Sequence, residues 1–338
     1  YNGAFVANVS GGVWAVANSF YNNYSSMGTG AVTPTFLQTS TDLATWTNRS
    51  ISIAPQTGVT NTSVGYTNLM GLGGLVGGGT SNRLVALFTK YSYVCCGATN
   101  PFVANTATSD DAGATWSYSN GLSGANNSYY APAITSSNAG FIIVQGNTAY
   151  WSTTGQNWQD ISANLKTALG VTSASVYTPY YNVYTANNLF IIPSYNNKFL
   201  VAPSSNGSNG NWSTISAENL PYGTSYAGNS SYINRIIHNG QCYVLGITPT
   251  GQIYYSNDLK YWFVKNDPVF GANFGTRPTN LGNKILTTTL NSNFYSFSAN
   301  GYTTATQFPV PALTGTQLTG GAGGYSGVSI WPVPYIKT

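Results

Sequence analysis

The chain has 338 residues and a formal net charge of +4, and only 5% of its residues are charged, against about 25% in an average soluble domain. Hydrophobic residues make up 42% and aromatic residues 14%, so the chain can bury a large core and disorder is excluded. It contains no run of Lys and Arg and no stretch of 18 apolar residues, which argues against a nucleic-acid partner and against membrane insertion.

Asn, Gly, Ser, Thr and Tyr take the place of charged residues on the predicted surface. Such a surface depends little on pH or salt because almost nothing on it titrates. We interpret this as a sign of an extracellular location, on a cell surface or a virus particle. The chain begins YNGAF, without an initiator Met, so we expect a processed product or a piece of something longer.

Short runs rich in β-branched and aromatic residues recur along the chain and predict β-strands. They come in pairs, with a turn and another apolar stretch before each pair and a further stretch after it. In chain order the pairs are 13–20 and 35–39, 83–90 and 102–108, 141–145 and 148–151, 189–194 and 199–204, 242–247 and 252–255, and 284–290 and 293–297. No helical period of useful length occurs, so the unit consists of four strands.

Five of these units contain a tryptophan in the same place, after a Ser-containing stretch. The tryptophans lie 42 to 70 residues apart and are Trp46, Trp116, Trp158, Trp212 and Trp262. A sixth copy, SANGYTT at 298–304, lacks the tryptophan. A four-strand unit of about 50 residues that occurs six times is typical of a β-propeller. We therefore predict an all-β fold, a six-bladed β-propeller of four-stranded antiparallel blades, with seven blades as the alternative.

The predicted propeller is a single domain over residues 1–338. The approximate blades are 1–54, 55–122, 123–165, 166–218, 219–267 and 268–313, and residues 314–338 form a C-terminal tail or a ring-closing strand.

The stretch SDDAGATW contains Ser109, Asp111, Gly113, Thr115 and Trp116, a pattern that resembles the Asp box of the sialidase-like, or bacterial-neuraminidase-repeat, propellers. Shorter copies keep Ser, Asp and Trp as Ser40, Asp42 and Trp46, and as Ser256, Asp258 and Trp262. Two further copies lack the Asp. The copy at 152–158 keeps Ser152 and Trp158, and the copy at 205–212 keeps a Ser and Trp212. An Asp side chain can bond to backbone N–H groups of its own turn, Gly accepts a positive φ, and Trp fills the gap between sheets.

The resemblance implies that these turns lie on the face opposite an active centre, so we expect Asp42, Asp111 and Asp258 to be structural and Asp110 to be a solvated neighbour. A calcium loop needs more oxygen ligands than SDDAGATW offers, and we expect no metal and no cofactor. Cys95 and Cys96 could form a vicinal disulfide. Alternatively they are, with Cys242, small buried hydrophobes.

Catalysis of the sialidase kind is not expected from this sequence. The resembling enzymes use three Arg, a Tyr nucleophile with a Glu partner, and an Asp acid. This chain has four Arg, a single Glu at position 218, a single His at position 238, and no acid in its first forty residues. We therefore predict no catalytic residue and no enzyme activity.

The loops at the other end of the blades are rich in Tyr and Asn, which together suit the apolar ring faces and hydroxyls of sugars. The candidate glycan-binding residues are Asn22, Asn23, Tyr24, Tyr91, Tyr93, Asn127, Tyr129 and Tyr130. The loops 21–30 and 91–101 belong to adjacent predicted blades and should meet. The function that we infer is non-catalytic recognition of a glycan or cell-surface receptor, through multivalent display or homo-oligomeric assembly. The alternatives are a structural subunit of a surface layer, sheath, fibre or capsid, and a degenerate sialidase-like glycoside hydrolase.

Overall fold

A computed structural model of the chain describes residues 4–9, 13–18, 21–23, 34–42, 45–52, 67–81, 83–93, 103–119, 122, 132–171, 182–194, 197–208, 210–220, 233–238, 240–247, 252–265, 274–281, 284–289, 294–298 and 306–308. Within these ranges the fold is all-β apart from one short helix, and neighbouring strands pair antiparallel. The all-β class and the four-stranded antiparallel unit are therefore confirmed.

The described strands form six sheets, and in each sheet every strand is hydrogen-bonded to the next one named. The first contains β1 (Ala4–Val9), β2 (Val13–Asn18), β4 (Pro34–Ser40) and β5 (Thr47–Ser52). The second contains β3 (Tyr21–Asn23), β6 (Thr67–Gly78), β7 (Arg83–Tyr93), β8 (Val103–Ser109) and β9 (Ser117–Tyr118). The third contains β10 (Ala133–Ser136), β11 (Phe141–Gln145), β12 (Thr148–Ser152) and β13 (Gln159–Asp160).

The remaining three sheets have four strands each. The fourth contains β14 (Tyr184–Ala186), β15 (Leu189–Ser194), β16 (Lys198–Pro203) and β17 (Ser213–Ser216). The fifth contains β18 (Ile233–His238), β19 (Tyr243–Ile247), β20 (Gln252–Ser256) and β21 (Phe263–Lys265). The sixth contains β22 (Phe274–Leu281), β23 (Lys284–Thr289), β24 (Phe294–Ser298) and β25 (Thr306–Phe308).

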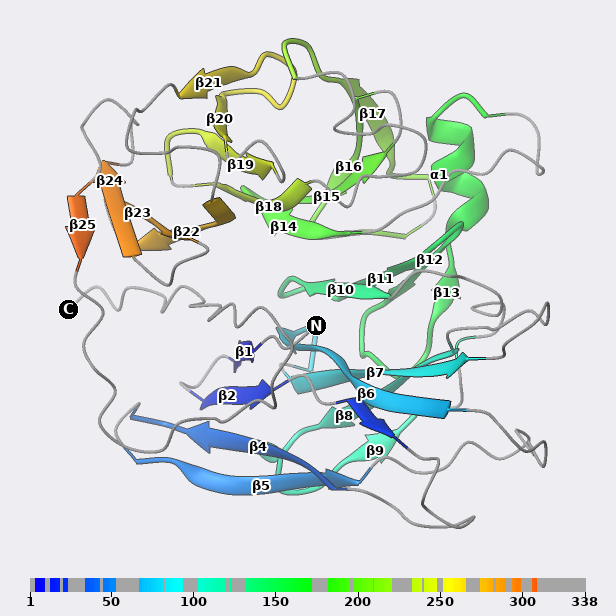
Figure 1. Ribbon diagram of the computed structural model, residues 1–338. Helices are drawn as coiled ribbons and strands as arrows, with labels where there is room; N and C mark the ends of the chain where they lie inside the picture. Colours follow the sequence, from blue (N-terminus) through cyan, green and yellow to red (C-terminus); the bar gives the residue numbers. More distant parts are fainter. Residues whose placement is uncertain are drawn as a thin grey trace.

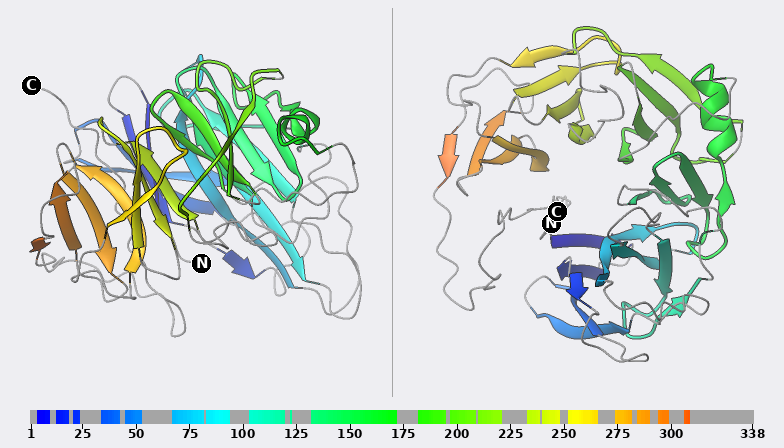
Figure 2. Two further views of the ribbon diagram at one scale, coloured as in Figure 1. Left: turned by 90° about the horizontal axis from the view of Figure 1, so that it is seen from above. Right: turned by 45° about the vertical axis from the view of Figure 1, so that its right-hand side comes forward.

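The sheets follow one another around a common centre (Figures 1 and 2). Their inner strands contact each other in series, β1 with β6, β6 with β10, β10 with β14, β14 with β18, and β18 with β22. In the described ranges the series ends at β22, and each sheet is open. The arrangement is that of a propeller, with each sheet packed face to face against the next.

The second sheet differs from the predicted four-strand unit because it gains a strand from the first. Residues 21–23, expected to begin a loop, form β3 and pair with the inner edge of β6, where Asn22 lies opposite Met70. The chain between β2 and β4 of the first sheet therefore contributes a strand to the second sheet, which links the two sheets in addition to their packing. The inner strand β6 is also rich in glycine, and a Cβ placed on Gly74 would lie 2.5 Å from the Cγ2 atom of Ile134 in the third sheet. Glycine thus permits the close approach of β6 and β10.

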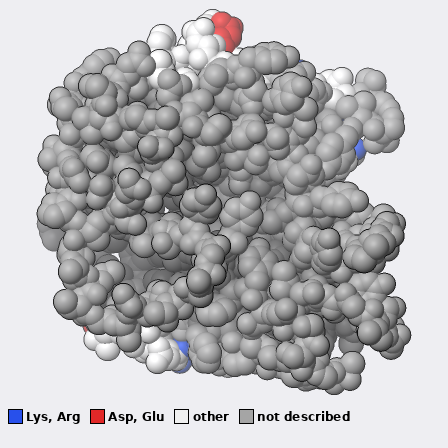
Figure 3. Space-filling model, in the orientation of Figure 1, with Lys and Arg blue, Asp and Glu red and all other residues white. Residues whose placement is uncertain are grey.

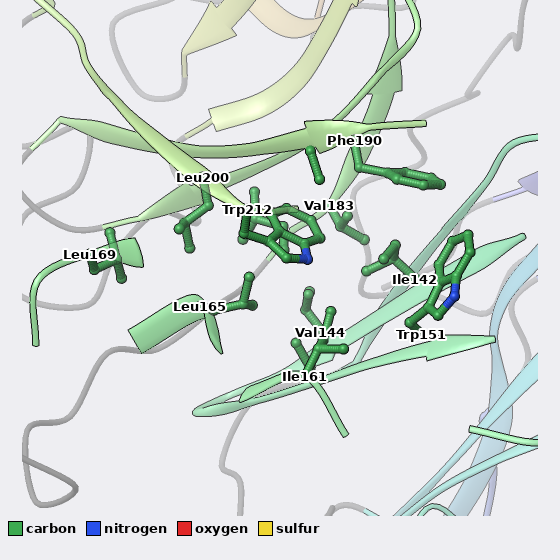
Figure 4. Packing of buried hydrophobic residues seen from close by; sticks show 13 residues of the cluster. Ile142, Val144, Trp151, Ile161, Leu165, Leu169, Val183, Phe190, Leu200 and Trp212 are labelled. Atoms are coloured by element: carbon green, nitrogen blue, oxygen red, sulfur yellow. The ribbon is translucent and has the colours of Figure 1, made fainter. Parts of the chain in front are cut away.

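The hydrophobic core lies between neighbouring sheets. Between the third and fourth sheets, Trp151 and Phe190 meet edge to face with their ring centroids 5.5 Å apart, as Figure 4 shows from close by. Buried residues from both sheets surround this pair, among them Ile142, Val144 and Leu200. Similar clusters join the first sheet to the second and the fourth to the fifth. The second and third strands of the third and fourth sheets are buried along almost their whole length, and they read as nearly continuous apolar runs.

A single helix, α1 (Ser162–Ala168), occurs in the described ranges, although none was expected from the sequence. Its buried Leu165 and the following Leu169 join the cluster between the third and fourth sheets. The carbonyl of Ala168 accepts a hydrogen bond from the hydroxyl of Thr214 at 2.6 Å. Seven residues are too few for a helical period to stand out in sequence, and tertiary packing stabilises this turn. Among the described residues, no helix has the length and apolar character needed to cross a membrane.

Candidate functional site

The complete box turn, 109–116, is stabilised by its own aspartate. Asp111 Oδ1 accepts hydrogen bonds from the Ser109 hydroxyl and the Thr115 backbone N–H, both at 2.8 Å, and Asp111 Oδ2 accepts one from the Thr115 hydroxyl at 2.6 Å. These donors, the Thr115 hydroxyl foremost, lower the pKa of Asp111 to about 2. Gly113 has a φ of +80°, and its carbonyl accepts the indole N–H of Trp116 at 3.1 Å. The carboxylate is therefore committed to the turn.

The two shorter copies that contain aspartate use it in the same way. Asp42 Oδ1 accepts the backbone N–H of Thr45 at 2.7 Å. Asp258 Oδ1 accepts the backbone N–H groups of Lys260 at 2.8 Å and Tyr261 at 3.0 Å, and these bonds, led by that of Tyr261, lower its pKa. In each copy the serine hydroxyl also donates to the aspartate, from Ser40 and Ser256.

The copy at 152–158 has no aspartate, but its serine accepts the same kind of backbone N–H groups as Ser40 and Ser109 do in the copies with aspartate. The Ser152 hydroxyl accepts the backbone N–H groups of Thr154 at 3.2 Å and Gly155 at 2.8 Å. The residue three before the tryptophan has a left-handed backbone in this copy as well, with a φ of +75° at Gly155. In the copy at 256–262 the same position is Leu259, which is left-handed although it is not a glycine, with a φ of +65°. The backbone path of the turn is thus kept where the side chains differ.

The box tryptophans are not buried equally, which corrects the expectation that all five are enclosed between sheets. Trp262 and Trp212 are buried, with 1% and 9% of their surface exposed, whereas Trp46, Trp116 and Trp158 are half-buried. The difference follows from their neighbours, because helix α1 packs into the cluster that holds Trp212, and the ring of Phe199 lies 5.8 Å from that of Trp262.

Asp110 is not merely a solvated neighbour of the box, which corrects the expectation from the sequence. Its carboxylate forms an ion pair with Arg83, with Oδ1 and Nε 2.7 Å apart, and the side chain of Arg83 is only 12% exposed. Arg83 also donates from Nη1 to the carbonyl of Thr154 at 3.3 Å. The guanidinium therefore ties the second sheet to the box turn of the third.

Four of the predicted glycan-binding residues lie in described strands of one sheet. Asn22 and Asn23 are in β3, and Tyr91 and Tyr93 are at the end of β7. Asn23 and Tyr91 both lie opposite Leu69, one on each side of β6. The register therefore brings the beginnings of the 21–30 and 91–101 segments together across one strand. Tyr24, Asn127, Tyr129, Tyr130, Cys95 and Cys96 lie outside the described residues.

The other titratable groups of the described chain are dispersed. Asp160 Oδ1 accepts the N–H of Ser162 at the start of α1, at 2.8 Å, and Glu218 lies 3.6 Å from Lys260. His238 Nδ1 accepts the N–H of Gly240 at 3.2 Å, and burial lowers its pKa. On the face shown in Figure 3, the described charged side chains lie singly at the margin. No group of three or more His, Cys, Asp or Glu with the geometry of a metal site occurs within the described ranges.

No model of a known protein family and no curated protein matches the sequence. Among solved structures the chain is similar to a virginiamycin B lyase from Staphylococcus aureus, with a TM-score of 0.53 and 11% identity over 92% of this chain and 84% of that chain. It is also similar to a streptogramin B lyase, with a TM-score of 0.51 and 9% identity over 90% and 82% of the two chains. These neighbours are β-propeller proteins, and at such identities the likeness concerns the fold alone.

Proposed function

We propose that this chain is an extracellular, non-catalytic recognition module built as a six-bladed propeller of the Asp-box type. The observation that carries the proposal is the use of its carboxylates. Each acidic residue of the described ranges is held by a turn, a helix start or an ion pair: Asp42, Asp110, Asp111, Asp160, Asp258 and Glu218. An ordinary glycosidase needs two carboxylates roughly 5–10 Å apart across its substrate. The five aspartates serve the scaffold instead, and Glu218 is an exposed carboxylate paired with Lys260.

The proposed recognition surface lies around the extended ends of β6 and β7, which have 12 and 11 residues. These ends point away from the box turns, because the β6–β7 turn and the box turn lie at the same end of the antiparallel sheet. Asn23, Leu69 and Tyr91 form a row across three strands there. The row thus brings a tyrosine and an asparagine to the same end of the sheet, on either side of β6. Tyrosine can supply a stacking face for a sugar, and asparagine can supply hydrogen-bonding groups.

The experiment that tests this proposal displays the full chain on a multivalent scaffold and measures its binding to cells and to a glycan array. Single sugar sites are weak, so display is needed for a measurable signal. Tyr91→Ala and Asn23→Ala should each lower binding at least tenfold without changing the melting temperature. Tyr118→Ala is the matched control, because Tyr118 is a 42% exposed tyrosine on the outer strand β9, and it should bind like the wild type.

Activity assays test the non-catalytic half of the proposal. The chain should release no product from sialosides or common glycosides. Turnover by the wild type that is lost in Glu218→Gln would show that the chain is an enzyme. In the binding assay, unchanged binding by Tyr91→Ala and Asn23→Ala would refute the proposed recognition surface.

A further inference from the structure

The outer strand of the fifth sheet presents large apolar side chains to solvent. Phe263 is 63% exposed, Tyr261 is 41% exposed and Val264 is 39% exposed, whereas Trp262 between them is 1% exposed. Side chains alternate along an extended segment, so Tyr261 and Phe263 lie on the side opposite to Trp262. Val264 pairs with Tyr254, which is buried in the core between the fourth and fifth sheets. Paired residues of neighbouring strands share a face of the sheet, so Val264 is on this face and Phe263, its neighbour, is on the opposite one.

The backbone beneath these rings is fixed by the segment that follows the fourth sheet. The N–H of Glu218 donates to the carbonyl of Lys260 at 2.7 Å, and the N–H of Trp262 donates to the carbonyl of Glu218 at 3.2 Å. Asp258 holds the N–H of Tyr261 on the other side at 3.0 Å. The two aromatic residues are thus carried on a turn bonded from both sides, and little backbone entropy would be lost when a ligand binds.

Two side chains of opposite charge lie at the Tyr261 end of this patch. Lys260 Nζ lies 3.6 Å from Glu218 Oε1, with side-chain exposures of 45% and 52%, and 4.6 Å from the centroid of the Tyr261 ring. The cluster therefore offers an exposed donor and an exposed acceptor next to Tyr261, without net charge.

This patch is not a general property of the outer strands. The outer strand of the third sheet carries Gln159 and Asp160, and that of the fourth carries Ser213, Thr214 and Ser216 around the half-buried Ile215. The outer strand of the second sheet, β9, has a single exposed aromatic residue, Tyr118. Edge strands are commonly protected by polar or charged residues, and β21 departs from that pattern. A stable protein partner would need about 800 Å² on each side, whereas a fully buried aromatic residue contributes roughly 150–250 Å². Two partly exposed rings thus match a ligand the size of one or two sugar units.

We infer that Tyr261 and Phe263 form a carbohydrate-binding platform for an uncharged pyranose. The apolar face of the sugar stacks on the Phe263 ring, which is 63% exposed, and the Tyr261 side chain with the Lys260 ammonium over its ring forms the edge of the platform. Lys260 donates to the sugar hydroxyls, and Glu218 accepts from them. Because the Lys260–Glu218 pair carries no net charge, it gives an acidic sugar no electrostatic gain to offset the cost of desolvating its carboxylate, and the ligand is therefore a neutral glycan. This platform lies on a different sheet from the surface around Asn23 and Tyr91, and it does not rest on the function proposed for that surface.

The test uses the full chain displayed as a tetramer on an array of neutral oligosaccharides that end in galactose, glucose or mannose, with sialylated counterparts. Phe263→Ala should lower the neutral signal at least tenfold, and Phe263→Tyr should retain it because the ring is kept. Tyr118→Ala, which removes an equally exposed tyrosine from the outer strand of a different sheet, should bind like the wild type. Melting curves of all variants verify that the fold is intact.

Three outcomes overturn the inference. One is an array without a neutral ligand, and another is a Phe263→Ala signal equal to that of the wild type. The third is a concentration-dependent dimer in sedimentation experiments that Phe263→Ala abolishes, which would assign the patch to self-association. Tyr91→Ala in the same array distinguishes the two surfaces. If Tyr91→Ala loses the binding signal and Phe263→Ala keeps it, the surface around Asn23 and Tyr91 is supported and the Phe263 platform is refuted.

Discussion

The side-chain hydroxyl of Thr106 accepts a hydrogen bond from the indole N–H of Trp158 at 3.1 Å. The same hydroxyl donates to the carbonyl of Gly155 at 3.1 Å. Thr106 belongs to β8 of the second sheet, whereas Trp158 and Gly155 belong to the box turn of the third. In the turns at 109–116 and 256–262 the indole bonds directly to the carbonyl three residues before it. In the third sheet a fully buried threonine is inserted between the two groups and joins two sheets.

Thr106→Val should destabilise the chain by about 1–3 kcal/mol, because it keeps the shape but leaves the Trp158 N–H and the Gly155 carbonyl without this partner. Urea unfolding followed by tryptophan fluorescence measures the change. Thr153→Val is the control, since Thr153 is exposed in the same turn, and it should change the stability by less than about 0.5 kcal/mol. Equal stability of Thr106→Val and the wild type would contradict a structural role for this hydroxyl.

Gly155→Ala should be more destabilising than Gly170→Ala. Both glycines are left-handed, with φ of +75° and +73°, but a Cβ at Gly155 would lie 2.6 Å from Val85 Cγ2, whereas one at Gly170 would meet nothing within 4 Å. The Gly170 variant therefore incurs only the backbone cost of about 1–2 kcal/mol, and the Gly155 variant adds a clash with the second sheet. Equilibrium denaturation compares them, and equal losses would show that the sheets can move apart at little cost.

Trp262→Ala should cost about 3–5 kcal/mol, as truncations of large buried side chains do. Trp116→Ala should cost less, because Trp116 is half-buried and its neighbouring cluster consists of smaller side chains. Thermal unfolding measures the loss of stability in each variant. A larger loss in Trp116→Ala than in Trp262→Ala would contradict the difference in burial between the two tryptophans.

The stability of the chain should fall as the pH is lowered from about 4 toward 2. The pKa of Asp111 is lowered from 3.8 to about 2 in the fold, so its contribution is present above 3.8 and is lost as the pH falls through the folded value. Asp111→Asn should flatten this part of the curve of urea midpoint against pH. Above pH 4 the two curves should run parallel, and a variant that keeps the full acid slope would be inconsistent with this assignment.

The sequence was sufficient for the features that depend on neighbours along the chain. The box turns close within eight residues, so serine, aspartate and the left-handed position near Gly113 predict a turn between the third and fourth strands, where the structure has it. The alternating pattern of strands and turns predicts four-stranded antiparallel sheets for the same reason, since, with the exception of β3, the strands of every described sheet pair in chain order.

Tertiary structure alone decided the features that depend on residues far apart in sequence. Nothing near Asn22 indicates that it pairs with Met70 in the next sheet, and nothing near Thr106 predicts its bond to an indole 52 residues away. The same holds for α1, which is too short to have a visible period and is stabilised by the two sheets that it contacts. The burial of each box tryptophan likewise depends on what the neighbouring sheet places over it. Local hydrogen bonding is encoded within a few residues, whereas the packing of one sheet on another depends on side chains that meet only once the chain has folded.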